Sequence, residues 1–95
     1  MSEYTSVLVE GVAAASAEID AAIAAHAEGW TLERMPTVDR NILRLATFEL
    51  LHTDDVPDRV AIDEAVELAK LVSTDRSPAF INGVLGRMLA ERAPS

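Results

Sequence analysis

Apolar residues recur along the chain at the spacing of helices. Over residues 5 to 26 they fall four or seven positions apart, which places them on one stripe of a helix. The residues of this stripe are Leu8, Val12, Ile19 and Ile23. Gly29 suits the end of the segment, because glycine is favoured just past a helix C-terminus. We expect the indole of Trp30 to anchor the core, and residues 31 to 34 to add one helical turn.

The next stretch, from Pro36 or Thr37 to about His52, is apolar around most of a helix circumference. Its apolar residues are Val38, Ile42, Leu43, Leu45, Ala46, Phe48, Leu50 and Leu51, and its polar stripe is Arg40, Arg44 and Thr47. A helix that is apolar on several sides is buried on several sides, so we expect this to be the central helix. The chain's other helices are not expected to cover all of it, which predicts an exposed apolar patch and a homodimer.

Two further helices follow. Residues 53 to 57 are rich in helix breakers and separate the central helix from one that runs to about Val72. The residues expected to face inward on it are Ile62, Ala65, Val66, Ala69 and Val72. Ser77 and Pro78 are typical of an N-cap and a first helical residue. The last helix carries a regular apolar stripe made of Phe80, Ile81, Val84, Leu85, Met88 and Leu89.

Since no strand pattern competes, the sequence predicts an all-α protein. We expect one domain over residues 1–95, a compact bundle of four main helices plus a short helical turn. No apolar stretch approaches the roughly 20 residues that span a bilayer, and the N-terminus lacks the features of a signal peptide. We therefore expect a cytoplasmic protein.

The composition gives no support to catalysis. Cysteine is absent, which excludes disulfides and thiolate chemistry. His26 and His52 each stand alone at a predicted helix end, where a protonated imidazole is favourable and a metal site is not indicated. Glu49 is the one charge in an apolar stretch; we expect backbone N–H groups or an arginine to hold it, with a partner contact as the alternative. We expect no catalytic residue, metal or cofactor.

The net charge of −8 is unevenly distributed along the chain. Residues 1 to 33 contain six acidic side chains and no Lys or Arg, and all eight basic side chains lie between Arg34 and Arg92. Lys and Arg supply most of the affinity for phosphates, so we expect any RNA contact to come from the later part of the chain. We also expect this binding to be weak. An acidic face suits a basic protein partner.

Six sequence blocks stand in a specific order. They are GWTL at 29–32, VDRNILRLA at 38–46, FELL at 48–51, VP at 56–57, VAIDEAVELAK at 60–70 and FINGVL at 80–85. In identity and spacing they resemble the NusB family of transcription antitermination factors, over about residues 4 to 90. The resemblance covers the C-terminal half of that family. Its N-terminal half, which opens with an Arg-rich helix that contacts RNA, has no counterpart here.

The resemblance implies a non-enzymatic adaptor in transcription antitermination. Such an adaptor binds a small-subunit ribosomal protein that acts as NusE, recognises boxA RNA in ribosomal RNA transcripts, and thereby acts on the RNA polymerase elongation complex. The alternative is the NusB-like RNA-recognition domain of a ribosomal RNA cytosine methyltransferase, which would need a further catalytic domain.

The resemblance also implies two groups of site residues. Matching positions assign the partner-protein contact to Glu33, Asp39 and Arg44, and the RNA contact to Arg76, Ser77 and Phe80. The residues alone also allow structural roles. Asp39 can interact favourably with the dipole of the helix near whose start it lies, and Arg44 can pair with a neighbouring acid. Phe80 can belong to the core, and Arg76 to a solvated loop. Family members often carry an acidic or polar residue where Arg76 stands.

Overall fold

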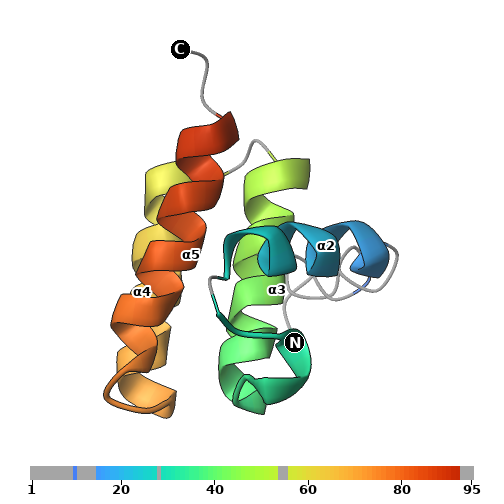
Figure 1. The fold of residues 1–95 in the computed structure, drawn as a ribbon. Helices are drawn as coiled ribbons and strands as arrows, with labels where there is room; N and C mark the ends of the chain where they lie inside the picture. The colour runs from blue at the N-terminus through green and yellow to red at the C-terminus, as the bar shows by residue number, and fades with distance from the viewer. Residues whose placement is uncertain (1–9, 11–14, 28, 54–55, 93–95) are drawn as a thin grey trace.

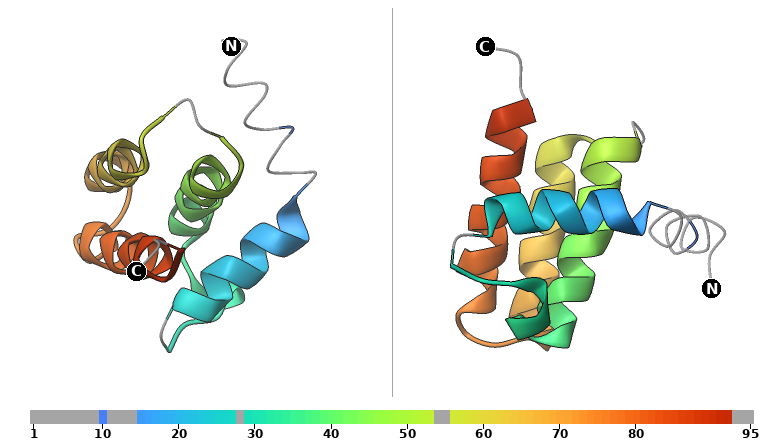
Figure 2. Two further views of the ribbon diagram at one scale, coloured as in Figure 1. Left: turned by 90° about the horizontal axis from the view of Figure 1, so that it is seen from above. Right: turned by 45° about the vertical axis from the view of Figure 1, so that its right-hand side comes forward.

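The computed structural model describes residues 10, 15–27, 29–53 and 56–92. Its elements are α2 (Ser16–His26), the 3-10 turn η1 (Leu32–Arg34), α3 (Thr37–His52), α4 (Asp58–Val72) and α5 (Ser77–Arg92). Helices α3, α4 and α5 stand side by side, and α2 lies across α3 and α5 (Figures 1 and 2). The described residues contain helices and no strand, so the all-α prediction is confirmed. Leu8 and Val12 of the first predicted stripe lie outside the described residues.

The core lies where the four helices meet, and α3 is its centre. Leu43 and Leu50 of α3 are inaccessible to solvent, and Phe48 is 9% exposed. Around them are the buried apolar residues of the other helices, which are Ile19, Ile23, Ala61, Ile62, Ala65, Ala69, Ile81, Val84, Leu85 and Met88. The prediction of a central helix is confirmed. Helices α2, α4 and α5 cover most of the circumference of α3, but Val38 of the predicted apolar patch is 39% exposed. The homodimer stays a prediction.

Two residues differ in burial from what the pattern of their helix indicates. Val72 was expected inside but is 53% exposed, because it is the last residue of α4, where the chain turns away towards α5. Thr47, which was assigned to the polar stripe of the central helix, is buried. That stripe faces other elements of the chain: Arg40 donates to the carbonyl oxygen of Leu32 at 3.0 Å. A periodic pattern of polar residues identifies one face of a helix, but the elements packed against that face determine whether it is exposed.

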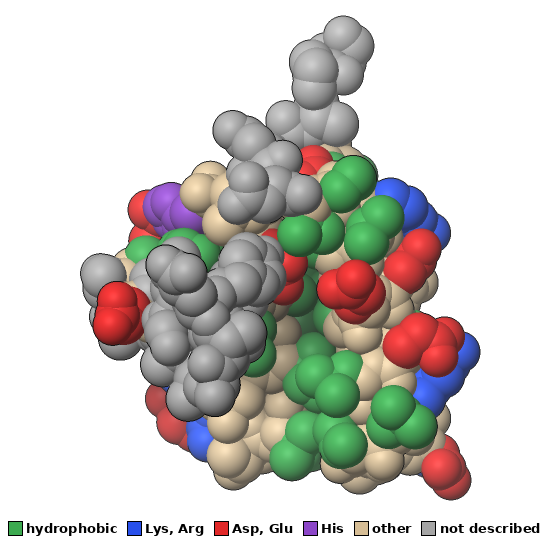
Figure 3. Space-filling view, turned by 180° about the vertical axis from the view of Figure 1, so that it is seen from behind, with side chains coloured by type: hydrophobic (Ala, Val, Ile, Leu, Met, Phe, Trp, Pro, Cys, Tyr) green, Lys and Arg blue, Asp and Glu red, His purple; other side chains and the backbone are tan. Residues whose placement is uncertain are grey.

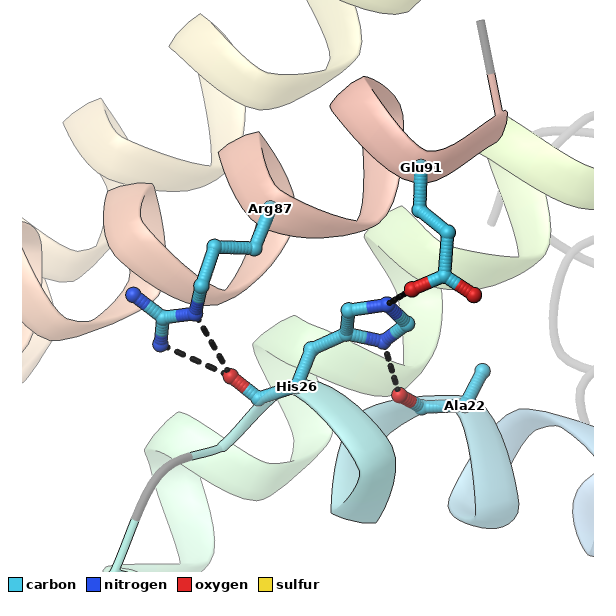
Figure 4. Close-up of polar contacts among 4 residues, drawn as sticks. All are labelled: Ala22, His26, Arg87 and Glu91. Atoms are coloured by element: carbon cyan, nitrogen blue, oxygen red, sulfur yellow. Dashed lines mark hydrogen bonds and ion pairs between the residues drawn. The ribbon is translucent and has the colours of Figure 1, made fainter.

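The C-terminal end of α2 is fixed to α5 by a cluster of polar contacts (Figure 4). Arg87 donates from Nε and Nη2 to the carbonyl oxygen of His26, at 3.0 and 2.7 Å. The His26 ring contacts the Ala22 carbonyl oxygen through Nδ1 and Glu91 Oε2 through Nε2, each at 2.7 Å. Both ring partners are acceptors, so the bond to Ala22 first, and then Glu91, raises the pKa of His26 although burial opposes this.

Candidate nucleic-acid interface

A pocket of about 200 Å³ opens at the end of the bundle where α3 and α5 begin. It is lined by Trp30, Pro36, Asp39, Thr74, Arg76, Ser77 and Phe80. These residues come from two regions far apart in sequence: the connection after α2 with the start of α3, and the α4–α5 loop with the first turn of α5. The fold therefore brings together all three predicted RNA-contacting residues, and adds four others.

One wall of the pocket is aromatic. Gly29 adopts a left-handed backbone conformation with φ of 76°, which ends α2 and directs the chain to Trp30. The Trp30 and Phe80 rings lie with centroids 5.9 Å apart and planes tilted by 55°. Trp30 is 49% exposed, so its prediction as a core anchor is wrong: η1 and the start of α3 leave half of the indole uncovered. Phe80 packs partly on the core while facing the pocket.

The floor of the pocket is a buried carboxylate surrounded by hydroxyl groups. Asp39 is 3% exposed, and its Oδ2 accepts a hydrogen bond from Ser77 Oγ at 2.7 Å. Its Oδ1 accepts another from Ser73 Oγ. Ser77 Oγ also lies 2.8 Å from Thr74 Oγ1. Because a buried charge is costly unless hydrogen-bonded, these hydroxyls make the burial of Asp39 tolerable and tie the α4–α5 loop to the start of α3.

Ser77 has a different local role from the one predicted. The backbone N–H of Phe80 donates to the carbonyl oxygen of Arg76 at 3.2 Å, so α5 begins at Ser77 itself. The N-cap prediction for Ser77 is therefore wrong by one residue. Its hydroxyl reaches across to Asp39 on α3, a contact 38 residues away in sequence that local pattern does not reveal.

Arg76 provides the cation of the pocket. Its side chain is exposed, and no hydrogen bond or ion pair joins it to the residues that the structure describes. A free guanidinium can pair with a phosphate through two N–H groups or stack on an aromatic or base ring. The pocket thus combines one available positive charge with two aromatic rings and several hydroxyls.

The three residues predicted to contact a protein partner do not form one surface. Glu33 is exposed on η1, whereas Asp39 is buried in the pocket floor. Arg44 binds Asp20 of α2 with two N–H groups, at 2.8 and 2.9 Å. That bond raises the pKa of Arg44, and it holds α2 against α3. Of the three, Glu33 alone presents its charge openly to solvent.

The described residues offer binding groups without an obvious reactive centre. Within them, no three His, Cys, Asp or Glu side chains gather as ligands for a metal ion. His52, the last residue of α3, lies 2.7 Å from Glu18 of α2 through Nε2. In the same part of the chain no helix combines the length and the apolar character needed to cross a membrane. Stacking surfaces, hydroxyls and a guanidinium are groups that recognise a ligand.

Sequence reasoning missed Trp30, Pro36 and Thr74 as members of the pocket. A signal for Trp30 was available: it directly follows the glycine that ends a helix, and it lies outside every apolar stripe of the chain. Pro36 and Thr74 carry no such signal, because only the packing of η1 and the α4–α5 loop brings them to the pocket.

A family model, curated relatives and a solved structure all match this chain to the same protein family. The model of the NusB family matches residues 1–90. The transcription antitermination protein NusB of Frankia casuarinae is 67% identical over 89 residues, which are 94% of this chain and 66% of that protein. The corresponding protein of Streptomyces avermitilis is 62% identical over 95 residues, all of this chain and 65% of that protein. The solved structure of T. maritima NusB superposes with a TM-score of 0.85 at 46% identity, over 92% of this chain and 61% of that one.

Proposed function

Because the chain belongs to the NusB family, we propose that it acts in transcription antitermination as a non-enzymatic adaptor that binds RNA at the pocket between Trp30 and Phe80. Relatives that share most of its sequence are named transcription antitermination proteins, although it spans only 61 to 66% of the three compared above. The observation that carries the proposal is the pair of Trp30, which is half exposed, and Phe80 beside Arg76, which has no ion-pair partner among the described residues. The RNA is a boxA element of ribosomal RNA transcripts, and the protein works in the cytoplasm.

The pocket suits an unpaired nucleotide. A base can stack on the exposed face of Trp30, since aromatic side chains bind single-stranded bases in this way. Arg76 is then placed to pair with a neighbouring phosphate, and the Thr74 hydroxyl to accept or donate a hydrogen bond at the pocket edge. With one available cation in the pocket and a net charge of −8, binding by this chain alone is expected to be weak and only slightly salt-dependent.

The test uses Trp30 as its own reporter, because it is the single tryptophan of the chain. Titrating boxA-type RNA should quench its fluorescence, and a labelled RNA followed by anisotropy gives the affinity. Trp30→Ala should weaken binding about tenfold, the effect of losing one stacked base. Arg76→Gln should weaken binding and lower the salt slope by about one. Arg59→Gln, which removes an exposed arginine of α4 remote from the pocket, is the matched control.

The proposal fails if the Trp30 and Arg76 variants bind RNA as well as the control does. It also fails if RNA binds while the Trp30 fluorescence stays unchanged, since the site must then lie elsewhere. Circular dichroism of each variant separates loss of binding from loss of fold.

A small-subunit ribosomal protein is the proposed protein partner, and Glu33 is its proposed acidic contact. The exposure of Glu33 supports this role, whereas Asp39 and Arg44 act by holding the pocket floor and α2. Glu33→Gln should weaken binding of the purified ribosomal protein about two- to fivefold, the usual effect of one rim charge. Asp75→Asn removes a comparable exposed charge and is the control. Equal affinities for the two variants would remove Glu33 from the contact.

A further inference from the structure

A groove runs along α3 and α4, on the face seen in Figure 3. It consists of two adjoining hollows of about 120 and 420 Å³ that share Glu64 and Leu68. The residues lining it are Ile42, Leu45, Ala46, Glu49, Val60, Ala61, Asp63, Glu64, Ala65, Glu67, Leu68 and Leu71. Figure 3 shows hydrophobic side chains gathered along this face with acidic ones beside them. None of these residues lines the Trp30–Phe80 pocket.

The apolar part of the groove is unusually open. Leu71 is 82% exposed, Val60 42% and Leu68 40%. A single exposed leucine needs no explanation, because much of any protein surface is apolar. Three large apolar residues that line one hollow on one helix are different, since such patches usually mark a contact with another molecule.

The charge of the groove limits what can cover it. Among its lining residues are four carboxylates, those of Glu49, Asp63, Glu64 and Glu67, and no Lys, Arg or His. Two of these carboxylates have a cation nearby: Lys70 lies 3.0 Å from Glu67, and Arg59 lies 3.8 Å from Asp63. All four side chains are more than half exposed, so these pairs are weak, and the lining of the groove itself stays acidic. Nucleic acid is disfavoured here by repulsion, and so is a second copy of a chain whose net charge is −8.

We infer that this groove binds a basic amphipathic segment of another protein. The apolar side chains of such a segment cover Val60, Leu68 and Leu71, and its Lys and Arg side chains face the carboxylates along the groove. A helix with apolar anchors on one face is the common ligand of an apolar groove between helices. The inference goes beyond the proposed function, because it assigns a protein contact to a surface separate from both the pocket and Glu33.

The test uses a synthetic helical peptide of about 18 residues, five turns, with Leu at positions i, i+3, i+4 and i+7 and Lys elsewhere. A second peptide replaces each Lys by Glu. The labelled Lys peptide should bind the protein and the Glu peptide should not. The double variant Leu68→Ser, Leu71→Ser should weaken binding about tenfold or more, since it removes two apolar anchors. The double variant Glu64→Gln, Glu67→Gln should weaken it about threefold and flatten its salt dependence.

Asp75→Asn is the matched control, because it removes an exposed acid outside the groove and should leave peptide binding unchanged. Both Leu residues are substantially exposed, so the fold should survive their replacement, and circular dichroism verifies this. Equal binding of the two peptides, or equal binding by the groove variants and the control, overturns the inference. A dimer in sedimentation equilibrium that the Leu variants dissociate also overturns it, because a second copy then occupies the groove. RNA titrations of the groove variants keep the two proposals apart: they should match the unmodified chain.

Discussion

The molecule has two candidate binding surfaces that are built in different ways. The pocket joins Trp30 and Phe80, which are distant in sequence, over a buried carboxylate with hydroxyl partners. The groove needs only α3 and α4, which are consecutive helices packed through apolar side chains. One surface presents an arginine without an ion-pair partner among the described residues, the other four carboxylates. The net charge of −8 therefore agrees in sign with the groove but not with the arginine of the pocket, and the position of each charge selects the class of ligand.

The two surfaces should also respond differently to substitution. Polar contacts between distant segments hold the pocket, so the loss of one hydrogen-bonding group can deform it. The groove rests on helix packing and should survive the same change. Each prediction below tests this contrast, and the expected effects decrease from the first to the last.

Asp39→Ala should have the largest effect. It removes the carboxylate that accepts hydrogen bonds from the Ser73 and Ser77 hydroxyls. These hydroxyls then lack their acceptor, which lowers the free energy of unfolding by about 2 to 4 kcal/mol. Urea denaturation measures this loss. In conditions where the variant remains folded, RNA binding should fall sharply while binding of the Lys peptide to the groove persists.

Asp39→Asn is the matched control, because the amide keeps one oxygen acceptor and the shape of the side chain. It should lose less stability than Asp39→Ala. If both variants were as stable as the unmodified chain, Asp39 would not hold the pocket floor, and the contrast between the two surfaces would lose its main support.

Arg76→Glu replaces the positive charge of the pocket by a negative one, which is the sign of the charges along the groove. Since Arg76 is exposed and unpaired among the described residues, stability should change little. RNA affinity should fall by more than about tenfold, because one attraction is replaced by a repulsion. Anisotropy with labelled RNA measures the fall, and Arg59→Glu provides the same charge change on α4. A comparable loss in both variants would mean that overall charge, and not the pocket, governs binding.

The Arg44–Asp20 pair tests how α2 is held. Its two hydrogen bonds and partial burial predict a coupling energy of about 1 kcal/mol in a double-mutant cycle with Arg44→Met and Asp20→Asn. The groove has no lining residue from α2, so peptide binding should be unaffected. Additive effects of the two substitutions would show that the pair does not stabilise the fold.

The smallest effect should come from the titration of His26. Its folded-state pKa is raised above 6.5, mainly by the Ala22 carbonyl and then by Glu91. Protonated His26 therefore stabilises the fold fully below that pH, and the contribution disappears as the pH rises through the folded pKa. Urea midpoints measured across this range should fall with rising pH more in the unmodified chain than in His26→Gln. Identical pH profiles would show that protonation of the His26 ring does not stabilise the fold.

Much of the fold could be predicted because helix packing is encoded locally. The periods of α3, α4 and α5 and the breakers between them predict the helices and nearly all their buried residues. The errors occur at residues whose burial depends on how a neighbouring element packs against them. Thr47 is covered by its neighbours, Val72 sits at a helix end, and Trp30 is held at the surface by the turn after Gly29. Glu49, which was expected to be held by backbone N–H groups or an arginine, is half-buried and lines the groove.

The candidate site was less accessible to sequence reasoning. Arg76, Ser77 and Phe80 were named only because of the family resemblance, and the structure places all three in one pocket. The network around Asp39 joins residues 34 and 38 positions apart, and no periodicity contains that information. The groove was also missed, since its most exposed apolar residues, Val60, Leu68 and Leu71, belong to α4, whereas the expectation concerned α3.

The attachment of α2 to α5 has a consequence for the order of folding. The contacts of His26 with Arg87 and Glu91 connect residues 61 and 65 positions apart, whereas α3 and α4 meet across a short connection. Closing a longer loop costs more chain entropy, so the helical hairpin of α3 and α4 can form before α2 and α5 are joined. Newly formed chains would then have the groove before they have the pocket. Trp30 fluorescence, which reports on the pocket, should accordingly reach its native value no earlier than the helical signal in a stopped-flow refolding experiment.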